Sequence, residues 1–425
     1  MCVVQWVLIV IGILWPVIAF GGGQAFSLVL TLAGLLCIPF AVPRFKTHFY
    51  ITGILLFLVF ATASAKWSPR PFEFISYNFE TWQFALRFDV LKLALILFWS
   101  GILISAAGTV EAGPARTIVT ITTWAMFVQL ILVALLTAFE PQVLKLFSFA
   151  MPEPGEGIQN ISRNGIILAL AAPFIVVGFG RQMSFSKALL VEILVLVAVV
   201  AVLAARGVNG PILSVGVGIA AVAVVRLFPS SGFKILGVGM AAVIMSAPWV
   251  FGYLSASADA ATASDSAEWR LAIWKRVIEV INQDPVFGSG LGVLRTIKDT
   301  VPSGEFANHM LIPNHAHNFA LQIWAETGGI GAGLFSLAIL LFAFRLPAPR
   351  YLSVAGFLGA ALAGQFISIG LVSFDFWNDW FWACAGILGA LIIIMAKAEA
   401  IQDPSRLLPA PDKMPSMQSY QPKGY

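Results

Sequence analysis

The chain has 425 residues, of which 59% are hydrophobic and 11% are charged, and its net charge is +4. A soluble protein carries roughly a quarter of its residues as charged ones, so this composition excludes an ordinary soluble protein. The positive charges are scattered between apolar runs, which argues against a nucleic-acid-binding protein, and we expect no nucleic-acid partner. The three cysteines form no C-x-x-C pair, which indicates neither a disulfide framework nor a zinc site.

Apolar runs long enough to cross a bilayer recur along the chain. A hydrocarbon core of about 30 Å needs roughly 17 to 25 apolar residues per helix, and a backbone in lipid must satisfy its own hydrogen bonds, which favours helices. The first run lacks a basic leader and an A-x-A cleavage site, so we expect a span rather than a removable signal. We predict an all-α integral membrane protein with about 12 transmembrane helices, at residues 3–20, 25–42, 48–64, 89–106, 116–138, 164–179, 186–204, 209–227, 233–251, 317–344, 351–373 and 380–396.

Three connections between the predicted spans are long. Residues 65–88 contain Trp, Phe and Tyr, as in an interfacial aromatic belt. Residues 139–163 end in a Gly- and Pro-rich stretch, and the longest connection can hold a small extramembrane domain. The predicted organisation is nine transmembrane helices, a periplasmic loop domain with an amphipathic helix, three further helices and a disordered cytoplasmic tail, at residues 1–251, 252–316, 317–396 and 397–425.

The basic residues near the predicted helix ends indicate an orientation. With the N-terminus in the cytoplasm, the short inward loops carry many basic residues, and the short outward loops carry only Arg206. We therefore expect a multi-pass protein of the bacterial inner membrane with both termini in the cytoplasm. The three long connections, and any active site that they build, would face the periplasm.

Arg206 is the exception to this charge pattern. It follows a predicted span in the sequence AARGVNG, at the outer membrane boundary. Its side chain can be a snorkelling arginine that reaches the lipid headgroups. Alternatively, it is a cation held at the membrane surface to bind an anion.

A second exception is Arg270, in the stretch EWRLAIWKRVIEVINQDP of the longest connection. This stretch is an amphipathic helix at about 100° per residue, and Arg270 falls among its apolar residues, near Trp274. A charge on an apolar face is unfavourable without a partner. Either the helix is rotated slightly, or the guanidinium of Arg270 projects into a pocket where its planar fork can bind phosphate oxygens.

Three of the four histidines, His309, His315 and His317, lie within nine residues, just before the tenth predicted span. The His-x-His spacing can bind a metal, but no cysteine or close carboxylate completes a ligand set, so we expect neither a metal nor a cofactor. His317 would sit where membrane meets water, and an imidazole there can exchange protons near neutral pH. A purely structural interfacial histidine is the alternative.

Two carboxylates lie inside predicted spans, where an ionised group costs about 3 kcal/mol or more. Glu326 follows His317 by about 13 Å of helix, so we expect it to support the site rather than to perform catalysis. Glu192 is either protonated or paired with a polar group on another helix.

The residues between Arg206 and Gly333 resemble the core of the O-antigen ligase and O-antigen polymerase superfamily of bacterial membrane glycosyltransferases. The resemblance rests on three elements in the family's order: Arg-Gly after a long apolar helix, then R-x-x-x-W followed by D-P-x-x-G-x-G-x-G, then H-x-H-N-x-x-L-Q-x-x-x-E-x-G-x-x-G. Each element is common alone, and their order and spacing make the match specific. Asn164, in SRNGIIL, resembles a further polar position of the family.

The resemblance implies a GT-C-like fold and a metal-independent, inverting transfer of a glycan from undecaprenyl diphosphate on the periplasmic face. Arg206 and Arg270 would bind the diphosphate, and His317 would activate the acceptor hydroxyl. The same resemblance suggests substrate contacts for five more residues, Asn164, Trp274, His315, Asn318 and Glu326.

The acceptor distinguishes two activities. Lipid A-core as acceptor would make the protein an O-antigen ligase, which we favour, and a second lipid-linked glycan would make it an O-antigen or exopolysaccharide polymerase. Twelve spans also suit a secondary transporter, although such proteins have matching halves and place unusual charges at mid-membrane. A non-catalytic scaffold for polysaccharide export is a third alternative.

Overall fold

The computed structural model describes ten segments of the chain, residues 2–21, 24–41, 49–78, 83–139, 154–181, 183–257, 265–301, 309–312, 315–346 and 353–399. Most of the predicted disordered tail, residues 400–425, lies outside these segments. The last helix continues to Glu399, slightly beyond the predicted boundary at residue 396.

Each predicted span coincides with a helix. Within the described segments, ten helices are long and apolar enough to cross a membrane, and two others contain shorter apolar stretches, Ala25–Ala41 and Thr52–Ser64. This confirms the class of an all-α integral membrane protein. The helices are α1 (Val3–Phe20), α2 (Gln24–Ala41), α3 (Phe49–Ser64), α4 (Asp89–Ala107), α5 (Ala112–Ala138), α7 (Pro154–Gly180), α8 (Phe185–Ala205), α9 (Asn209–Leu227), α10 (Gly232–Ser257), α12 (Phe319–Arg345), α13 (Val354–Ser373) and α14 (Asp379–Glu399).

Small residues allow the closest helix approaches in the bundle. A methyl group added at Gly364 of α13 would come within 2.8 Å of the Ala221 side chain on α9, and Gly237 of α10 is in comparable contact with Ala343 of α12. Packing through small residues is the usual means of association between membrane helices.

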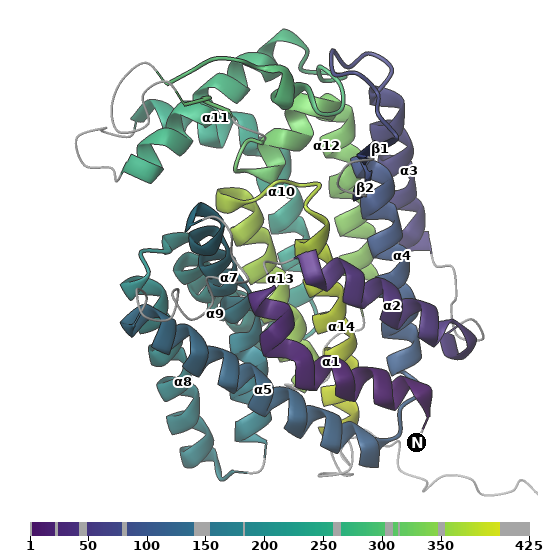
Figure 1. The fold of residues 1–425 in the computed structure, drawn as a ribbon, viewed down its shortest axis with the longest axis vertical. Helices are drawn as coiled ribbons and strands as arrows, with labels where there is room; N and C mark the ends of the chain where they lie inside the picture. Colours follow the sequence, from purple (N-terminus) through teal and green to yellow (C-terminus); the bar gives the residue numbers. More distant parts are fainter. Residues whose placement is uncertain are drawn as a thin grey trace, which may run out of the picture.

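An extramembrane layer covers one end of the bundle. Its main element is α11 (Asp265–Gln283), which lies over α10 and α12 at the upper end of the molecule (Figure 1). The apolar residues of α11 face inward, and Ile273, Trp274 and Val277 are buried. An amphipathic helix therefore forms where the sequence predicts one, and a short 3-10 helix, η3 (Val293–Thr296), follows it.

The connection before α4 contains a β-hairpin that the sequence analysis did not predict. Strands β1 (Ile75–Asn78) and β2 (Gln83–Leu86) are antiparallel, with Ile75 opposite Leu86. Only β1 alternates apolar and polar residues along its whole length of four residues, and the aromatic content of the segment obscured this short pattern. Phe72, Phe74 and Tyr77 are exposed around the hairpin.

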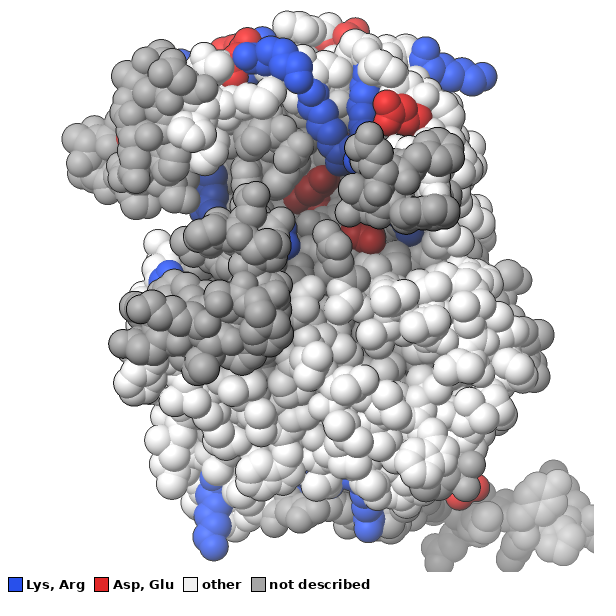
Figure 2. All heavy atoms as spheres, viewed as in Figure 1, with Lys and Arg blue, Asp and Glu red and all other residues white. Residues whose placement is uncertain are grey.

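On one face of the molecule the charged side chains are concentrated towards its two ends. On the face shown in Figure 2, coloured side chains gather at the upper and lower ends, and a broad belt of uncharged side chains separates them. A belt of this kind is the surface that a bilayer requires of a spanning protein. The upper part of the same face is hollowed, and charged side chains line the hollow (Figure 2).

Glu192 lies on a small cavity between α7, α8, α9 and α13. The cavity has a volume of about 70 Å³, and Pro173, Val215 and Gln365 also line it. The Oε1 atom of Gln365 is buried and has no hydrogen-bond donor in the described part of the chain. Gln365 of α13 is therefore a polar group on another helix that borders the same cavity as Glu192, as one of the two alternatives for Glu192 requires.

Candidate active site

Helix α11 is fastened to the segment that carries the histidines. The indole of Trp274 donates a hydrogen bond to the carbonyl of Ala316 at 3.2 Å, and the indole of Trp269 donates to the carbonyl of Leu311 at 3.0 Å. Trp274 also packs edge-on against Phe251 of α10, with ring centroids 4.9 Å apart. These contacts fix the indole of Trp274 at the backbone of Ala316, the residue between His315 and His317.

Arg270 is largely buried on the inner side of α11. Burial lowers the pKa of its guanidinium, and no carboxylate among the described residues acts on it. Arg270 is more exposed than its buried neighbours Ile273 and Trp274, so both predicted alternatives, a position at the edge of the apolar face and a projection into a pocket, stay open. A buried cation in this situation is a ready binding group for an anion.

His315 and His317 lie against each other, with ring centroids 4.2 Å apart. Burial, helped by the neighbouring His315 and Arg270, lowers the pKa of His317 to about 3, against the opposing effects of a hydrogen bond to the backbone of Ser373 and the charge of Asp375. Burial and the charge of Arg295 lower the pKa of His315 to about 4. Both imidazoles are therefore neutral at pH 7, and Arg270 lies within electrostatic reach of His317.

Asn318 determines how the chain enters α12 after His317. Its Oδ1 atom accepts hydrogen bonds from the backbone N–H groups of Ala320 at 3.0 Å and Leu321 at 3.1 Å, as an N-cap residue does. Its Nδ2 atom is buried without an acceptor in the described part of the chain. The cap occupies one end of the amide, and the other end can still donate to a substrate.

Arg206 ends α8 beside the same region. Gly207 adopts φ +67°, and the N–H of Val208 bonds to the carbonyl of Leu203 at 3.1 Å, which is the hydrogen-bond pattern of a helix ended by a left-handed glycine. Gly210, at the start of α9, is so close to Ser373 that an added methyl group would lie 2.6 Å from the Ser373 hydroxyl. Ser373 in turn bonds His317 through its backbone, so the turn after Arg206 and His317 meet at the end of α13.

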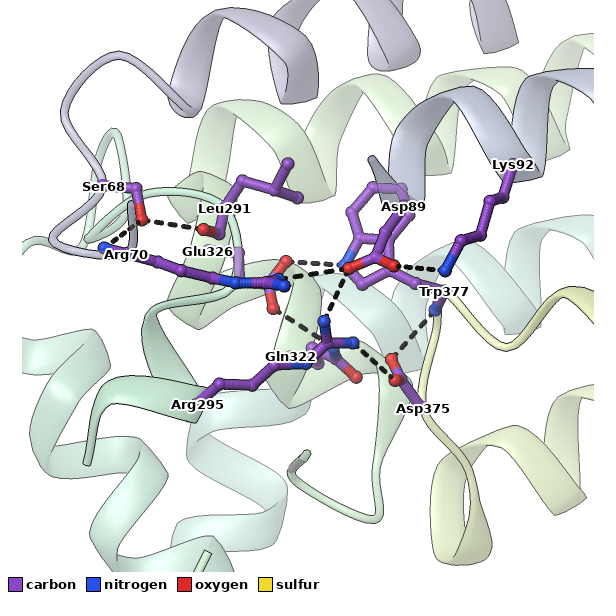
Figure 3. A network of polar contacts seen from close by, with 10 residues as sticks. All are labelled: Ser68, Arg70, Asp89, Lys92, Leu291, Arg295, Gln322, Glu326, Asp375 and Trp377. Atoms are coloured by element: carbon purple, nitrogen blue, oxygen red, sulfur yellow. Dashed lines mark hydrogen bonds and ion pairs between the residues drawn. The ribbon is translucent and has the colours of Figure 1, made fainter. Parts of the chain in front are cut away.

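A network of charged groups that the sequence did not predict joins Arg70, Asp89, Arg295 and Asp375 (Figure 3). Arg295 pairs with Asp89 at 2.8 Å and with Asp375 at 3.4 Å, and Asp89 also pairs with Arg70 and Lys92. Burial raises the pKa of Asp375, and the charge of Arg295 opposes this effect. The charge of Asp375 raises the pKa of His317, and the charge of Arg295 lowers the pKa of His315. The network therefore influences the protonation of both imidazoles.

Glu326 is buried against this network. Its two oxygens accept hydrogen bonds from the side chain of Gln322 at 3.1 Å and from the indole of Trp377 at 2.6 Å. Gln322 accepts a bond from the N–H of Phe376 at 3.0 Å. This position agrees with a supporting role for Glu326, and its predicted contact with substrate stays a prediction.

The glycine-rich stretch after α11 docks onto a break in α12. Gly328 has φ 61° and ψ −167°, which interrupts the helix. The N–H groups of Ser289 and Gly290 bond to the carbonyls of Ala325 and Glu326 at 2.8 and 3.1 Å, and the N–H of Gly329 bonds to the carbonyl of Pro285. These glycines serve close backbone contact, since a methyl group on Gly288 would lie 2.5 Å from the backbone of Gly328.

Asn164 lies inside the bundle, joined to α1 and α5. Its amide accepts a bond from Gln129 at 3.0 Å and donates to the carbonyl of Ala19 at 3.0 Å, and Gln129 accepts a bond from the indole of Trp15 at 2.8 Å. Each polar atom of Asn164 already has a partner, which favours a role in joining these helices. Contact between Asn164 and substrate stays a prediction.

A cavity of about 650 Å³ in the extramembrane layer is lined in part by the glycine-rich stretch. Arg276, Gln283, Phe287 and Trp67 are among its lining residues, and none of Arg206, Arg270 and His317 is. Arg276 is paired with Asp299 and Glu279. Arg270 and His317, which influence each other electrostatically, lie outside this cavity. Among the described residues, no three His, Cys, Asp or Glu form a group that could hold a metal ion.

The fold and this geometry define a polytopic membrane protein with a polar site beneath an extramembrane helix. Residues 194–336 match the family described as O-Antigen ligase, from within α8 to within α12, and the segment contains Arg206, Arg270 and His317. This match confirms the resemblance to the O-antigen ligase superfamily.

Similar proteins in Rickettsia point the same way. A candidate polysaccharide ligase of Rickettsia felis is 29% identical over 146 residues, which cover 32% of this chain and 34% of the relative. Candidate polysaccharide ligases of Rickettsia conorii and Rickettsia typhi are 29% and 28% identical over 143 and 144 residues. The chain matches about a third of the length of these relatives.

Proposed function

We propose that this protein transfers a glycan from undecaprenyl diphosphate to an acceptor sugar on the periplasmic face, and that the acceptor is lipid A-core. This would make it an O-antigen ligase of the bacterial inner membrane. The observation that carries the proposal is the pairing of buried Arg270, which has no carboxylate partner among the described residues, with the neutral imidazole of His317. Both residues lie in the segment that matches the O-antigen ligase family.

The diphosphate would bind at Arg270 and Arg206. Each guanidinium offers a planar fork of N–H donors that matches phosphate oxygens. As the glycosidic bond to the diphosphate breaks, its electron pair moves onto the leaving diphosphate, and the fixed positive charges stabilise the growing negative charge. Because Arg270 is already partly desolvated in the free protein, less solvent has to be reorganised for this interaction.

His317 would take the proton from the acceptor hydroxyl. One ring nitrogen is used in the bond to the backbone of Ser373, which leaves the other nitrogen free to accept a proton. A base with a pKa near 3 is weak, but a bound diphosphate adds negative charge beside Arg270 and so raises the pKa of His317 toward its ordinary value. Substrate binding would therefore create the base that the reaction needs.

The bond changes follow from these roles. The acceptor oxygen attacks the anomeric carbon, its proton moves to His317, and undecaprenyl diphosphate leaves from the opposite side, so the configuration inverts without a metal ion. His317 then returns the proton to the diphosphate or to water. His315, Asn318 and Trp274 would contact the sugars, Asn318 through its Nδ2 atom, which has no acceptor in the described part of the chain.

The test is a transfer assay with the purified protein in lipid nanodiscs. The donor is an undecaprenyl-diphosphate glycan, and the acceptor is either lipid A-core or a second lipid-linked glycan. A mass increase of lipid A-core supports the ligase, and a mass increase of the second lipid-linked glycan shows a polymerase instead. Transfer to neither acceptor, together with solute uptake by vesicles that Glu192→Gln abolishes, would establish a transporter.

A further inference from the structure

Two arginines at the other end of the bundle have buried guanidinium nitrogens for which the described residues provide no partner. The Nε atom of Arg116 and the Nε and Nη1 atoms of Arg181 are buried and have no hydrogen-bond acceptor in the described part of the chain. Buried polar atoms in folded proteins are normally paired, so such atoms indicate a missing ligand. Neither arginine lies in the segment that carries the proposed glycan transfer.

The start of α5 lies at the end of the bundle away from His317. Helix α14 begins beside the site, where Trp377 and Asp375 lie, and its last turn carries Lys397. Lys397 donates hydrogen bonds to the carbonyls of Gly108 and Val110, just before α5, at 2.7 and 2.6 Å. Arg116, one turn into α5, is therefore on the face of the membrane opposite to α11.

Arg116 and Arg181 lie on facing parts of α5 and α7. Arg116 precedes Thr123 by two helical turns and so shares its face of α5. Thr123 touches Gly178 of α7, and Phe127, one turn further, packs on Phe179 with ring centroids 5.4 Å apart. Arg181 follows directly after this packed end of α7.

The two positive charges act on each other without compensation. Burial lowers the pKa of Arg181, and the charge of Arg116 lowers it further, whereas no carboxylate of the described residues acts on it. Two like charges held together in a partly desolvated place are unfavourable unless an anion lies between them. Two guanidinium forks suit a phosphate group in particular.

The neighbouring surface of α5 is suited to an acyl chain. Trp124, Val128, Ile131 and Leu135 are 55%, 41%, 43% and 46% exposed, and their spacing places them on one side of the helix. This strip begins two turns beyond Arg116 and runs into the membrane. We propose that Arg116 and Arg181 form a phosphate-binding site, occupied by the headgroup of an anionic phospholipid whose acyl chain lies along this strip. Basic sites between helix ends are typical positions for such lipids.

The experiment is native mass spectrometry of the full-length, delipidated protein with added phosphatidylglycerol or phosphatidylcholine at equal concentration. We expect wild type to retain phosphatidylglycerol in preference, and the double variant Arg116→Gln/Arg181→Gln to bind it about 30-fold more weakly. Arg116→Lys/Arg181→Lys keeps the charge and loses the fork, so it should bind with intermediate affinity. The matched control Arg226→Gln/Lys234→Gln removes two exposed charges of helix ends and should bind as wild type.

Equal retention of both lipids by wild type, or unchanged phosphatidylglycerol binding by the glutamine double variant, would overturn the proposal. A second arm distinguishes the source of the phosphate. Inorganic phosphate is added alone, and the thermal unfolding of the protein is followed. Stabilisation of wild type by inorganic phosphate, without any preference for phosphatidylglycerol, would overturn the lipid as the occupant. Neither arm measures glycan transfer, so failure here is distinct from failure of the proposed function.

Discussion

The backbone of His317 holds a conformation that L-residues avoid. Its φ is +50°, and in the described part of the chain it is the one non-glycine residue with positive φ. This conformation costs about 1–2 kcal/mol, so neighbouring bonds must maintain it. Trp274 binds the preceding residue, Ala316, and Asn318 caps the helix that follows. We infer that this segment fixes the direction of the His317 ring.

Replacement of the two central side chains should abolish most transfer. His317→Ala removes the proposed base and should lower kcat by about 10²–10⁴-fold. Arg270→Ala removes a donor to the leaving diphosphate and should lower kcat by about 10²–10³-fold. Both variants should insert into the membrane normally, which is checked by their yield and size-exclusion profile.

Two control variants separate these effects from general damage. Arg276→Ala removes a paired arginine from the same helix as Arg270, and His309→Ala removes an exposed histidine. Both should transfer glycan at nearly the wild-type rate. Full activity of His317→Ala or Arg270→Ala in the same assay would refute the assigned roles.

The pH dependence follows from the lowered pKa of His317. Because protonation begins only near pH 3 in the free protein, kcat/KM should show no loss from His317 between pH 7 and pH 5. A bound diphosphate raises this pKa, so the acid limb of kcat should lie at higher pH than that of kcat/KM. Rates measured from pH 4 to pH 8 test this order, and an acid limb of kcat/KM near pH 6.5 would contradict it.

The sequence alone identified the unusual polar residues of the site, but it did not identify the charged residues that surround them in the structure. Arg270 and His317 stand out because each is polar where the local pattern is apolar. Arg295 and Asp375 lie in connections where charges are common, and their significance arises only when a contact across 80 positions brings them together. Burial of Asp375 is likewise a property of the assembled ends of α13 and α14, which no local pattern reports.

At the level of helices and strands, the break in α12 is the feature that shapes the site. The N–H and carbonyl groups freed at Gly328 bond to the glycine-rich stretch after α11, so the break is satisfied by protein backbone. Hydrophobic runs predicted the helix, but a T-G-G-I-G sequence does not reveal whether a helix continues through it. The hairpin escaped prediction for a related reason, since its strands are shorter than the periodicity needed to recognise them.

Gly328→Ala should damage both stability and transfer. A methyl group there would collide with the carbonyl of Val286, in a backbone conformation that only glycine adopts readily. The cost is expected to exceed about 2 kcal/mol, seen as a lower thermal midpoint in detergent. Gly333→Ala, on the same helix and with nothing within 4 Å, is the control and should unfold as wild type. Equal midpoints for the two variants would show that the break is not required.

At the scale of the whole molecule, the spans and their order follow from the positions of the apolar runs in the sequence, because a bilayer imposes the length and polarity of each helix. The arrangement of the extramembrane layer does not follow, since it depends on Trp67, Trp269 and Trp274 bonding to backbone carbonyls of distant segments. The orientation of the layer rests on the distribution of basic residues and is open to a direct test.

We predict that α11 faces the periplasm and that the α9–α10 turn faces the cytoplasm. Lys298 is exposed in the extramembrane layer and Arg226 is exposed at the end of α9, so a cysteine at either position should be accessible to solvent. With the native Cys2, Cys37 and Cys384 replaced by serine, a membrane-impermeant maleimide should label Lys298→Cys in intact spheroplasts. Arg226→Cys should be labelled only after the membrane is permeabilised. Labelling in the reverse order would place the histidines and arginines of the site on the cytoplasmic face, where a periplasmic glycan could not reach them.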